Sequence, residues 1–218
     1  MLSELQQQLN DIYQVGPHYD VRDYLITDPT LARYIGGDAM LRNTSETLLM
    51  RQDEDGLALS LFLDSDMLER LESADPLRRL RAEQLDDFWK VLEGISHFNC
   101  MVWKATQERP VSLLELELQA EIDKFVSTML LVLGQGDHDM LNRLHGRLFD
   151  NVSFRVELDA EQCDRYRFAN DYAARFCRAL RRCLIDDDGR AMSELRRFYR
   201  LPLGDKVSHI HTRSWSSS

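Results

Sequence analysis

The sequence has no long hydrophobic run. Its longest nearly apolar stretch, Phe125 to Leu133, covers nine residues, whereas a membrane-spanning helix needs about 20. The amino terminus also lacks a basic flank followed by an apolar stretch, so we expect no secretory signal. These absences predict a cytoplasmic protein without a membrane segment.

Cysteine is scarce, and its spacing shows no metal-binding or redox motif. The chain has four cysteines and no C-x-x-C pair. Three of them lie among apolar residues of expected helices. We therefore expect reduced, mostly buried thiols, as is usual in cytosolic proteins.

Sequence motifs for nucleophilic catalysis and nucleotide binding are also missing. The chain contains no G-x-S-x-G, no phosphate-binding loop and no glycine fingerprint of a dinucleotide-binding fold. Most acid, base and nucleophilic residues fall where helix capping, solvation or packing already explains them. This pattern favours a role in interaction or regulation over catalysis.

Charge is present in ordinary amounts but is distributed unevenly. The 218 residues carry a net charge of −10. Residues 1–159 hold 15 Lys and Arg against 29 Asp and Glu, whereas residues 160–218 hold 12 against 8. The chain therefore joins a basic carboxy-terminal third to an acidic body.

The hydrophobic pattern predicts a mainly α fold, a helical bundle around a central helical hairpin at about 82–133. Apolar residues recur at steps of three and four over 82–105. A turn follows near Pro110. Ser112 and Glu115 then form a capping box, in which each side chain satisfies a free backbone N–H of the next helix. The same periodicity predicts helices over 3–13, 137–148, 160–184 and 190–200.

A small β-hairpin is predicted near the amino terminus, at about 47–63. Residues 47–51 and 57–63 read as strands, separated by a turn that ends in Asp55-Gly56. Because a lone hairpin is barely stable in water, we expect it to pack on helices or to gain a third strand from residues 23–27.

These elements suggest an α+β part over residues 1–80 and a helical bundle over residues 81–212. We expect the two parts to form one compact unit. A polar tail over residues 213–218 is expected to be disordered.

One polar constellation follows from the geometry of the expected helical hairpin. Glu93 and His97 are four residues apart on the first helix, and Glu117 and Glu121 are four apart on the second, so each pair shares a helix face. Antiparallel pairing places His97 opposite about residue 120. The four residues are therefore a candidate polar site or divalent-metal site, although ion-paired helix faces would give the same spacing.

The basic carboxy-terminal third suggests a face for an anionic partner. Arginines interleave with aromatic residues there, as in some nucleic-acid binders. Helical spacing puts several of the aromatic residues on the apolar stripe and most arginines off it. The candidate face consists of Arg167, Arg178, Arg182 and Arg197.

The sequence is compatible with three functions. The first is an interaction or regulatory module that binds a protein partner or self-associates. The alternative is a helical-bundle enzyme or metal-binding protein that uses His97, Glu117 and Glu121. The third is a binder of nucleic acid or another anionic partner through the basic helices. We expect a protein partner or homo-oligomer rather than nucleic acid. The sequence implies no cofactor and leaves only a divalent metal open.

The apolar pattern generates one stability prediction. The expected core of the hairpin contains Leu92, Ile95, Val102, Leu118, Ile122, Phe125 and Met129. Replacing Phe125 by Ala should lower the free energy of unfolding by about 3–5 kcal/mol, because it leaves a cavity. Chemical denaturation measures this change, and a loss below about 1 kcal/mol would show that Phe125 is not a core residue.

Overall fold

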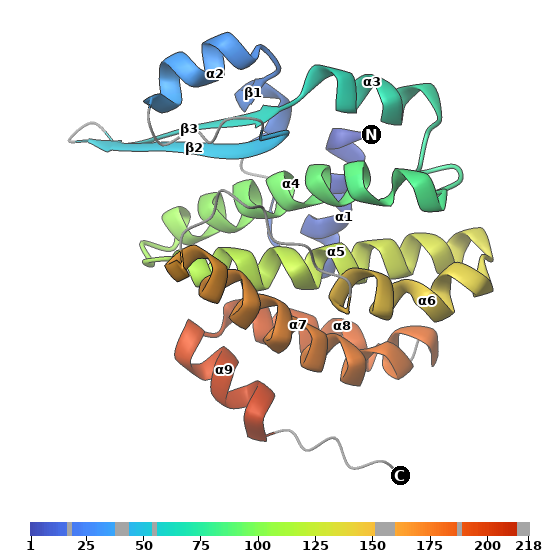
Figure 1. Ribbon diagram of the computed structural model, residues 1–218. Helices are drawn as coiled ribbons and strands as arrows, with labels where there is room; N and C mark the ends of the chain where they lie inside the picture. The colour runs from blue at the N-terminus through green and yellow to red at the C-terminus, as the bar shows by residue number, and fades with distance from the viewer. Residues whose placement is uncertain (17–18, 38–43, 54–55, 151–159, 187–188, 213–218) are drawn as a thin grey trace. The chain divides into compact units, whose positions relative to one another are not determined.

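A computed structural model describes residues 1–16, 19–37, 44–53, 56–150, 160–186 and 189–212. The predicted mainly α fold with a small amino-terminal β-hairpin is confirmed (Figure 1). The chain divides into two compact units. The first contains residues 1–10 and 15–110, and the second contains residues 11–14 and 111–218.

The first unit combines helices with all the strands of the described chain. Its helical elements are α1 (Leu2–Tyr13, as far as Asn10), η1 (Val21–Tyr24), α2 (Pro29–Gly36), α3 (Ser65–Ser73), η3 (Ala82–Gln84) and α4 (Leu85–Thr106). Side chains cap several of them. The carboxylate of Asp28 accepts hydrogen bonds from the backbone at the start of α2, and Asp64 does the same for α3.

The strands are β1 (Leu25–Ile26), β2 (Glu46–Asp53) and β3 (Gly56–Leu63), and their order in the sheet is β1-β3-β2. The antiparallel β2–β3 pair runs from Glu46 opposite Leu63 to Asp53 opposite Gly56. Residues 25 and 26 pair in parallel with β3. The expected hairpin and its expected third strand are both confirmed.

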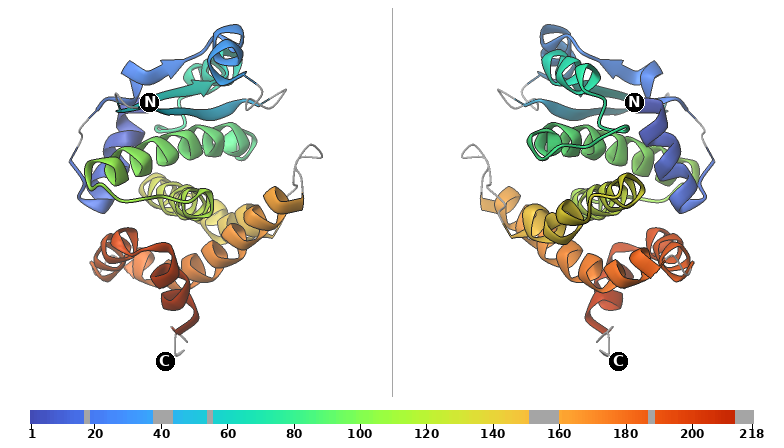
Figure 2. Two further views of the ribbon diagram at one scale, coloured as in Figure 1. Left: turned by 90° about the vertical axis from the view of Figure 1, so that its left-hand side faces the viewer. Right: turned by 90° about the vertical axis from the view of Figure 1, so that its right-hand side faces the viewer.

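The three-stranded sheet lies between α2 and α4 (Figure 2). Alternation along a strand points successive side chains to opposite faces. Phe62 and Leu49 pack with Ala32 of α2 on one face. Leu61 points to the opposite face and lies against α4 at Gly94. The hairpin is therefore supported by helices on both sides.

The second unit is built from helices. They are α5 (Leu113–Gln135), α6 (His138–Phe149), α7 (Ala160–Asp186), α8 (Arg190–Arg200) and α9 (Leu203–Thr212). Ser112 accepts a hydrogen bond from the backbone N–H of Glu115, 3.2 Å away, as expected for the start of α5. Phe125 is fully buried, and its ring centroid lies 5.9 Å from that of Phe149 of α6.

A stripe of buried polar residues runs along α5. Glu115, Gln119 and Asp123 recur every four residues, and each is at most 3% exposed. Lys206 of α9 is fully buried, and its ammonium lies 3.1 Å from the Glu115 carboxylate and 3.5 Å from the Gln119 amide oxygen. The ion pair therefore connects α9 to the start of α5.

Tyr13 completes this buried polar stripe from the short segment 11–14. Its hydroxyl donates to the Asp123 carboxylate, and the Gln119 amide donates to both oxygens at 2.9 Å. Burial raises the pKa of Tyr13 well above its usual value, and the neighbouring Asp123 charge raises it further. The hydroxyl consequently keeps its proton and remains a donor to Asp123.

Some sequence-based expectations extend beyond these findings. The division at residue 80 stays a prediction, and the tail at residues 213–218 lies outside the described residues.

Of the seven expected core residues, Val102 is only partly buried and the other six are fully buried. No helix in the described parts of the chain is long and apolar enough to cross a membrane.

The buried ion pair generates a second stability prediction. Lys206→Met removes the ammonium and leaves the Glu115 carboxylate buried without it, which should cost about 3–5 kcal/mol in chemical denaturation. Lys90→Met is the matched control, because Lys90 pairs at 2.5 Å with Asp86, whose side chain is 80% exposed. We expect the control to cost less than about 1 kcal/mol. Equal losses in the two variants would contradict a special role for the buried pair.

Candidate functional site

Helix α4 brings together two potential metal ligands from the predicted set. Glu93 and His97 are one helical turn apart, so both side chains project from the same face. His97 is 9% exposed, and Glu93 is partly buried. This local pairing is the part of the predicted site that depends only on helix geometry.

The third member of the cluster comes from the sheet. Glu46 is the first residue of β2 and lies opposite Leu63 of β3. Residues directly opposite each other in an antiparallel pair point to the same face. Leu48 pairs with Leu61, which lies against α4. Glu46 shares that face because it is two residues from Leu48, and its carboxylate therefore reaches the α4 surface.

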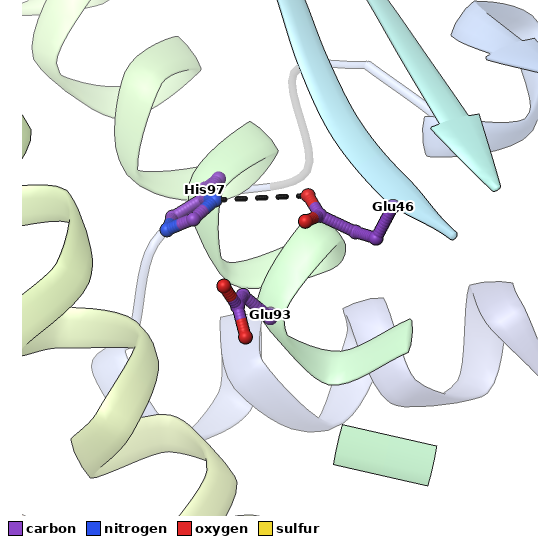
Figure 3. Close-up of side chains that lie close together, drawn as sticks. All are labelled: Glu46, Glu93 and His97. Atoms are coloured by element: carbon purple, nitrogen blue, oxygen red, sulfur yellow. Dashed lines mark ion pairs between the residues drawn. The ribbon is translucent and has the colours of Figure 1, made fainter. Parts of the chain in front are cut away.

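The three side chains converge across the space between β2 and α4 (Figure 3). The Nδ1 atom of His97 lies 3.7 Å from Oε1 of Glu46, and both side chains are 11% exposed. One ligand atom from each of Glu46, Glu93 and His97 lies within 4.8 Å of the other two. Within the described ranges of the chain, no other group of three or more His, Cys, Asp or Glu residues meets this criterion.

Two carboxylates and one imidazole form a mixed oxygen and nitrogen donor set. Imidazole suits zinc, iron, nickel and copper, whereas carboxylate alone favours magnesium, calcium and manganese. Bonds from zinc to such nitrogen and oxygen atoms are about 2.0–2.2 Å long. Donors already within 4.8 Å of one another need only small side-chain movements to reach a common ion of this class.

The other residues of the predicted polar site lie on α5, in the second unit. Glu117 is 8% exposed. The carboxylate of Glu121 pairs with the Lys124 ammonium at 2.6 Å. Their convergence with His97 stays a prediction. The ion pairs among the described residues join His97 to Glu46 and Lys124 to Glu121.

Sequence reasoning missed Glu46. A strand residue about 50 positions from His97 has no helical spacing to it, so periodicity gives no signal. The available clue was the alternation of the hairpin, because Glu46 shares a strand face with the apolar Leu48. A charged residue on the apolar face of a strand is unusual enough to merit attention.

All four arginines of the predicted face are exposed, and they differ in whether an acidic side chain pairs with them. Arg167 pairs with Asp164 at 3.3 Å. Arg178, Arg182 and Arg197 are exposed. No ion pair joins these three to an acidic residue in the part of the chain that the structure describes.

The histidines near the carboxy terminus have separate partners. His209 contacts the Glu194 carboxylate, and the Nε2 atom of His211 lies 3.3 Å from the Tyr172 hydroxyl. Among the described residues, the two imidazoles therefore have different partners. Comparison of the chain with protein-family models, curated proteins and solved structures gave no match.

Proposed function

We propose that the protein binds a divalent first-row transition-metal ion through Glu46, Glu93 and His97. The observation that carries this proposal is the convergence of two carboxylates and an imidazole, each on a fixed element, within 4.8 Å. The set resembles metal sites in its donor types and in its limited exposure. It differs from the sequence-based hypothesis in using Glu46 of β2 in place of Glu117 and Glu121 of α5.

Electrostatics supports a cation at this place. Two carboxylates no more than 4.8 Å apart repel each other by at least about 3 kcal/mol at an effective dielectric constant near 20. A protonated imidazole neutralises one negative charge. A divalent ion neutralises both and accepts lone pairs from all three groups, so it gains the most from this arrangement.

Three protein ligands also determine what the ion is able to do. A tetrahedral ion with three protein ligands keeps one position for water or a substrate, as in catalytic zinc sites. A bound ion acts there as a Lewis acid and lowers the pKa of its water. The same ion ties β2 to α4, because its ligands come from both elements.

The four cysteines are free thiols, and Cys100 and Cys177 are buried. Burial raises the pKa of the Cys177 thiol well above its usual value, and the charges of Glu121 and Asp123 raise it further. Free thiols suit a reducing compartment. We therefore propose that the protein binds this metal in the cytoplasm.

The metal proposal is tested by titrating Zn²⁺, Co²⁺ and Mn²⁺ into chelator-treated protein. We expect one ion per chain by calorimetry, and a rise in Tm of about 5–10 °C at 100 times the Kd, since binding then adds about 2.7 kcal/mol of stability. Glu46→Gln and His97→Gln should each weaken binding at least about 100-fold, more than the loss of an outer-shell partner.

The matched control is Glu117→Gln combined with Glu121→Gln, which removes the two carboxylates of the alternative site. Unchanged affinity in this variant favours Glu46 and Glu93 as the ligands. Loss of binding in this control and normal binding in Glu46→Gln would instead favour the site that uses α5. Wild-type binding weaker than a Kd of about 0.1 mM for all three ions would exclude the metal function.

A second candidate function is docking of an acidic protein segment on α7. Its support is the contrast among exposed arginines. Arg175 pairs with Asp171 at 2.7 Å, whereas Arg178 and Arg182, one turn apart, have no such pair with the described acidic residues. Such a pair of guanidinium groups presents forked donors to carboxylates and accelerates association more than it tightens it.

The docking proposal predicts salt-sensitive association. Replacing both Arg178 and Arg182 by Glu should lower the association rate with an acidic polypeptide, polyglutamate, at least about tenfold at low salt. The control is Arg22→Glu with Arg143→Glu, which changes the net charge equally at two arginines that already have acidic partners. Equal effects of the two double variants would show that net charge alone sets the association rate. Retention of single-stranded DNA instead of polyglutamate would assign the face to nucleic acid.

A further inference from the structure

Gly94 lies inside α4, between the two α4 residues of the proposed metal site. Glycine inside a helix weakens the helix relative to alanine. Its backbone φ is not in the left-handed region that favours glycine. Conformation therefore does not explain the residue, and the explanation has to be steric.

The neighbours of Gly94 provide that explanation. A Cβ atom built there would lie 2.9 Å from Cδ1 of Leu61 and 3.1 Å from Cγ of Glu46. It would also lie 3.3 Å from Oε1 of Glu46. Distances this short require the neighbours to move, because carbon atoms pack favourably at about 3.5–4.0 Å.

The oxygen that a side chain at position 94 would displace is the same one that faces His97. Oε1 of Glu46 lies 3.7 Å from Nδ1 of His97. The hydrogen atom of Gly94 thus leaves space that the Glu46 carboxylate fills, directly beside the imidazole. Because Gly94 has no Cβ, the sheet packs closely on α4 and this oxygen lies beside His97.

We infer that Gly94 is a positioning residue for metal binding, an inference that rests on the proposed metal function. Its lack of a side chain lets the Glu46 carboxylate lie close enough to α4 to share an ion with Glu93 and His97. Metal-ligand distances vary by only about 0.2 Å around their preferred values. A shift of a few tenths of an ångström at Glu46 is therefore large for this site, although it is small for a packed core.

The test compares Gly94→Ala with Gly134→Ala. Gly134 lies in α5 with nothing within 4 Å of an added Cβ, so it reproduces the chemical change without the contact. We expect Gly94→Ala to weaken Zn²⁺ binding about 10- to 100-fold, the range typical of outer-shell changes. Gly134→Ala should leave the Zn²⁺ affinity unchanged.

Ion size separates positioning from a general loss of structure. Because a displaced Glu46 widens the site, Gly94→Ala should bind the larger Cd²⁺ with a smaller loss than Zn²⁺. The visible spectrum of the Co²⁺ protein should also change, since it reports the coordination geometry. A loss that is equal for Zn²⁺ and Cd²⁺, with an unchanged Co²⁺ spectrum, would overturn the inference.

A second variant covers the case in which Gly94→Ala fails to fold. Leu61→Val removes the Cδ1 atom that lies 2.9 Å from the added Cβ, so the double variant Leu61→Val/Gly94→Ala keeps only the contact with Glu46. It should fold and still bind Zn²⁺ about 10- to 100-fold more weakly than Leu61→Val alone. Equal affinity of these two variants would refute the role of Gly94. Absence of binding by the wild-type protein would refute the metal function itself.

Discussion

A charged group that leaves water must meet a compensating group, and this constraint decides what lies against α5. Glu115, Gln119 and Asp123 are buried on one stripe of that helix. Without partners they would cost several kcal/mol each. Lys206 supplies the positive charge and Tyr13 supplies a hydroxyl donor. Elements from opposite ends of the chain therefore belong to one unit because a polar stripe in its middle requires them. Apolar packing alone would accept many orientations of a short helix such as α9, whereas an ion pair between two fully buried side chains accepts few.

The same constraint applies to the cluster of acidic and imidazole side chains in the first unit. Glu46, Glu93 and His97 bring two carboxylates and one imidazole into a space that is mostly closed to water. The polar stripe of α5 contacts an ammonium of the same unit, because Lys206 of α9 pairs with Glu115. The cluster on α4 has an excess of acidic groups over its imidazole, and its donors are of types that coordinate metals. The proposed divalent cation would neutralise both carboxylates, as the Lys206 ammonium neutralises Glu115 in the second unit. The physical difference is that a metal ion is exchangeable and a lysine is not.

How much of this could be read from the sequence depends on the range of the interactions. The cap at Ser112 and the spacing of Glu93 and His97 are set within one or two helical turns, so the sequence predicts them. The hairpin follows from alternation and a turn. To predict that Glu46 lies beside His97, two further facts are needed: the strand register and the packing of the sheet on α4. Local periodicity indicates neither of them. The polar stripe of α5 is visible as a spacing of four, but its partner Lys206 is about 90 residues away. Nothing local connects them.

The arginines of α7 show what burial cannot explain. Arg178 and Arg182 are exposed, so removing them leaves no cavity and no buried charge. The helix dipole favours positive charge only in the last turn, and Arg178 lies two turns before the end at Asp186. Solubility does not account for the pair either. The whole chain carries a net charge of −10, and positive charges bring that value closer to zero, where proteins associate more readily. Neither a buried contact, the helix dipole nor solubility therefore explains this pair. The proposed acidic partner would give it a role, because two forked donors one turn apart match carboxylates on a facing surface.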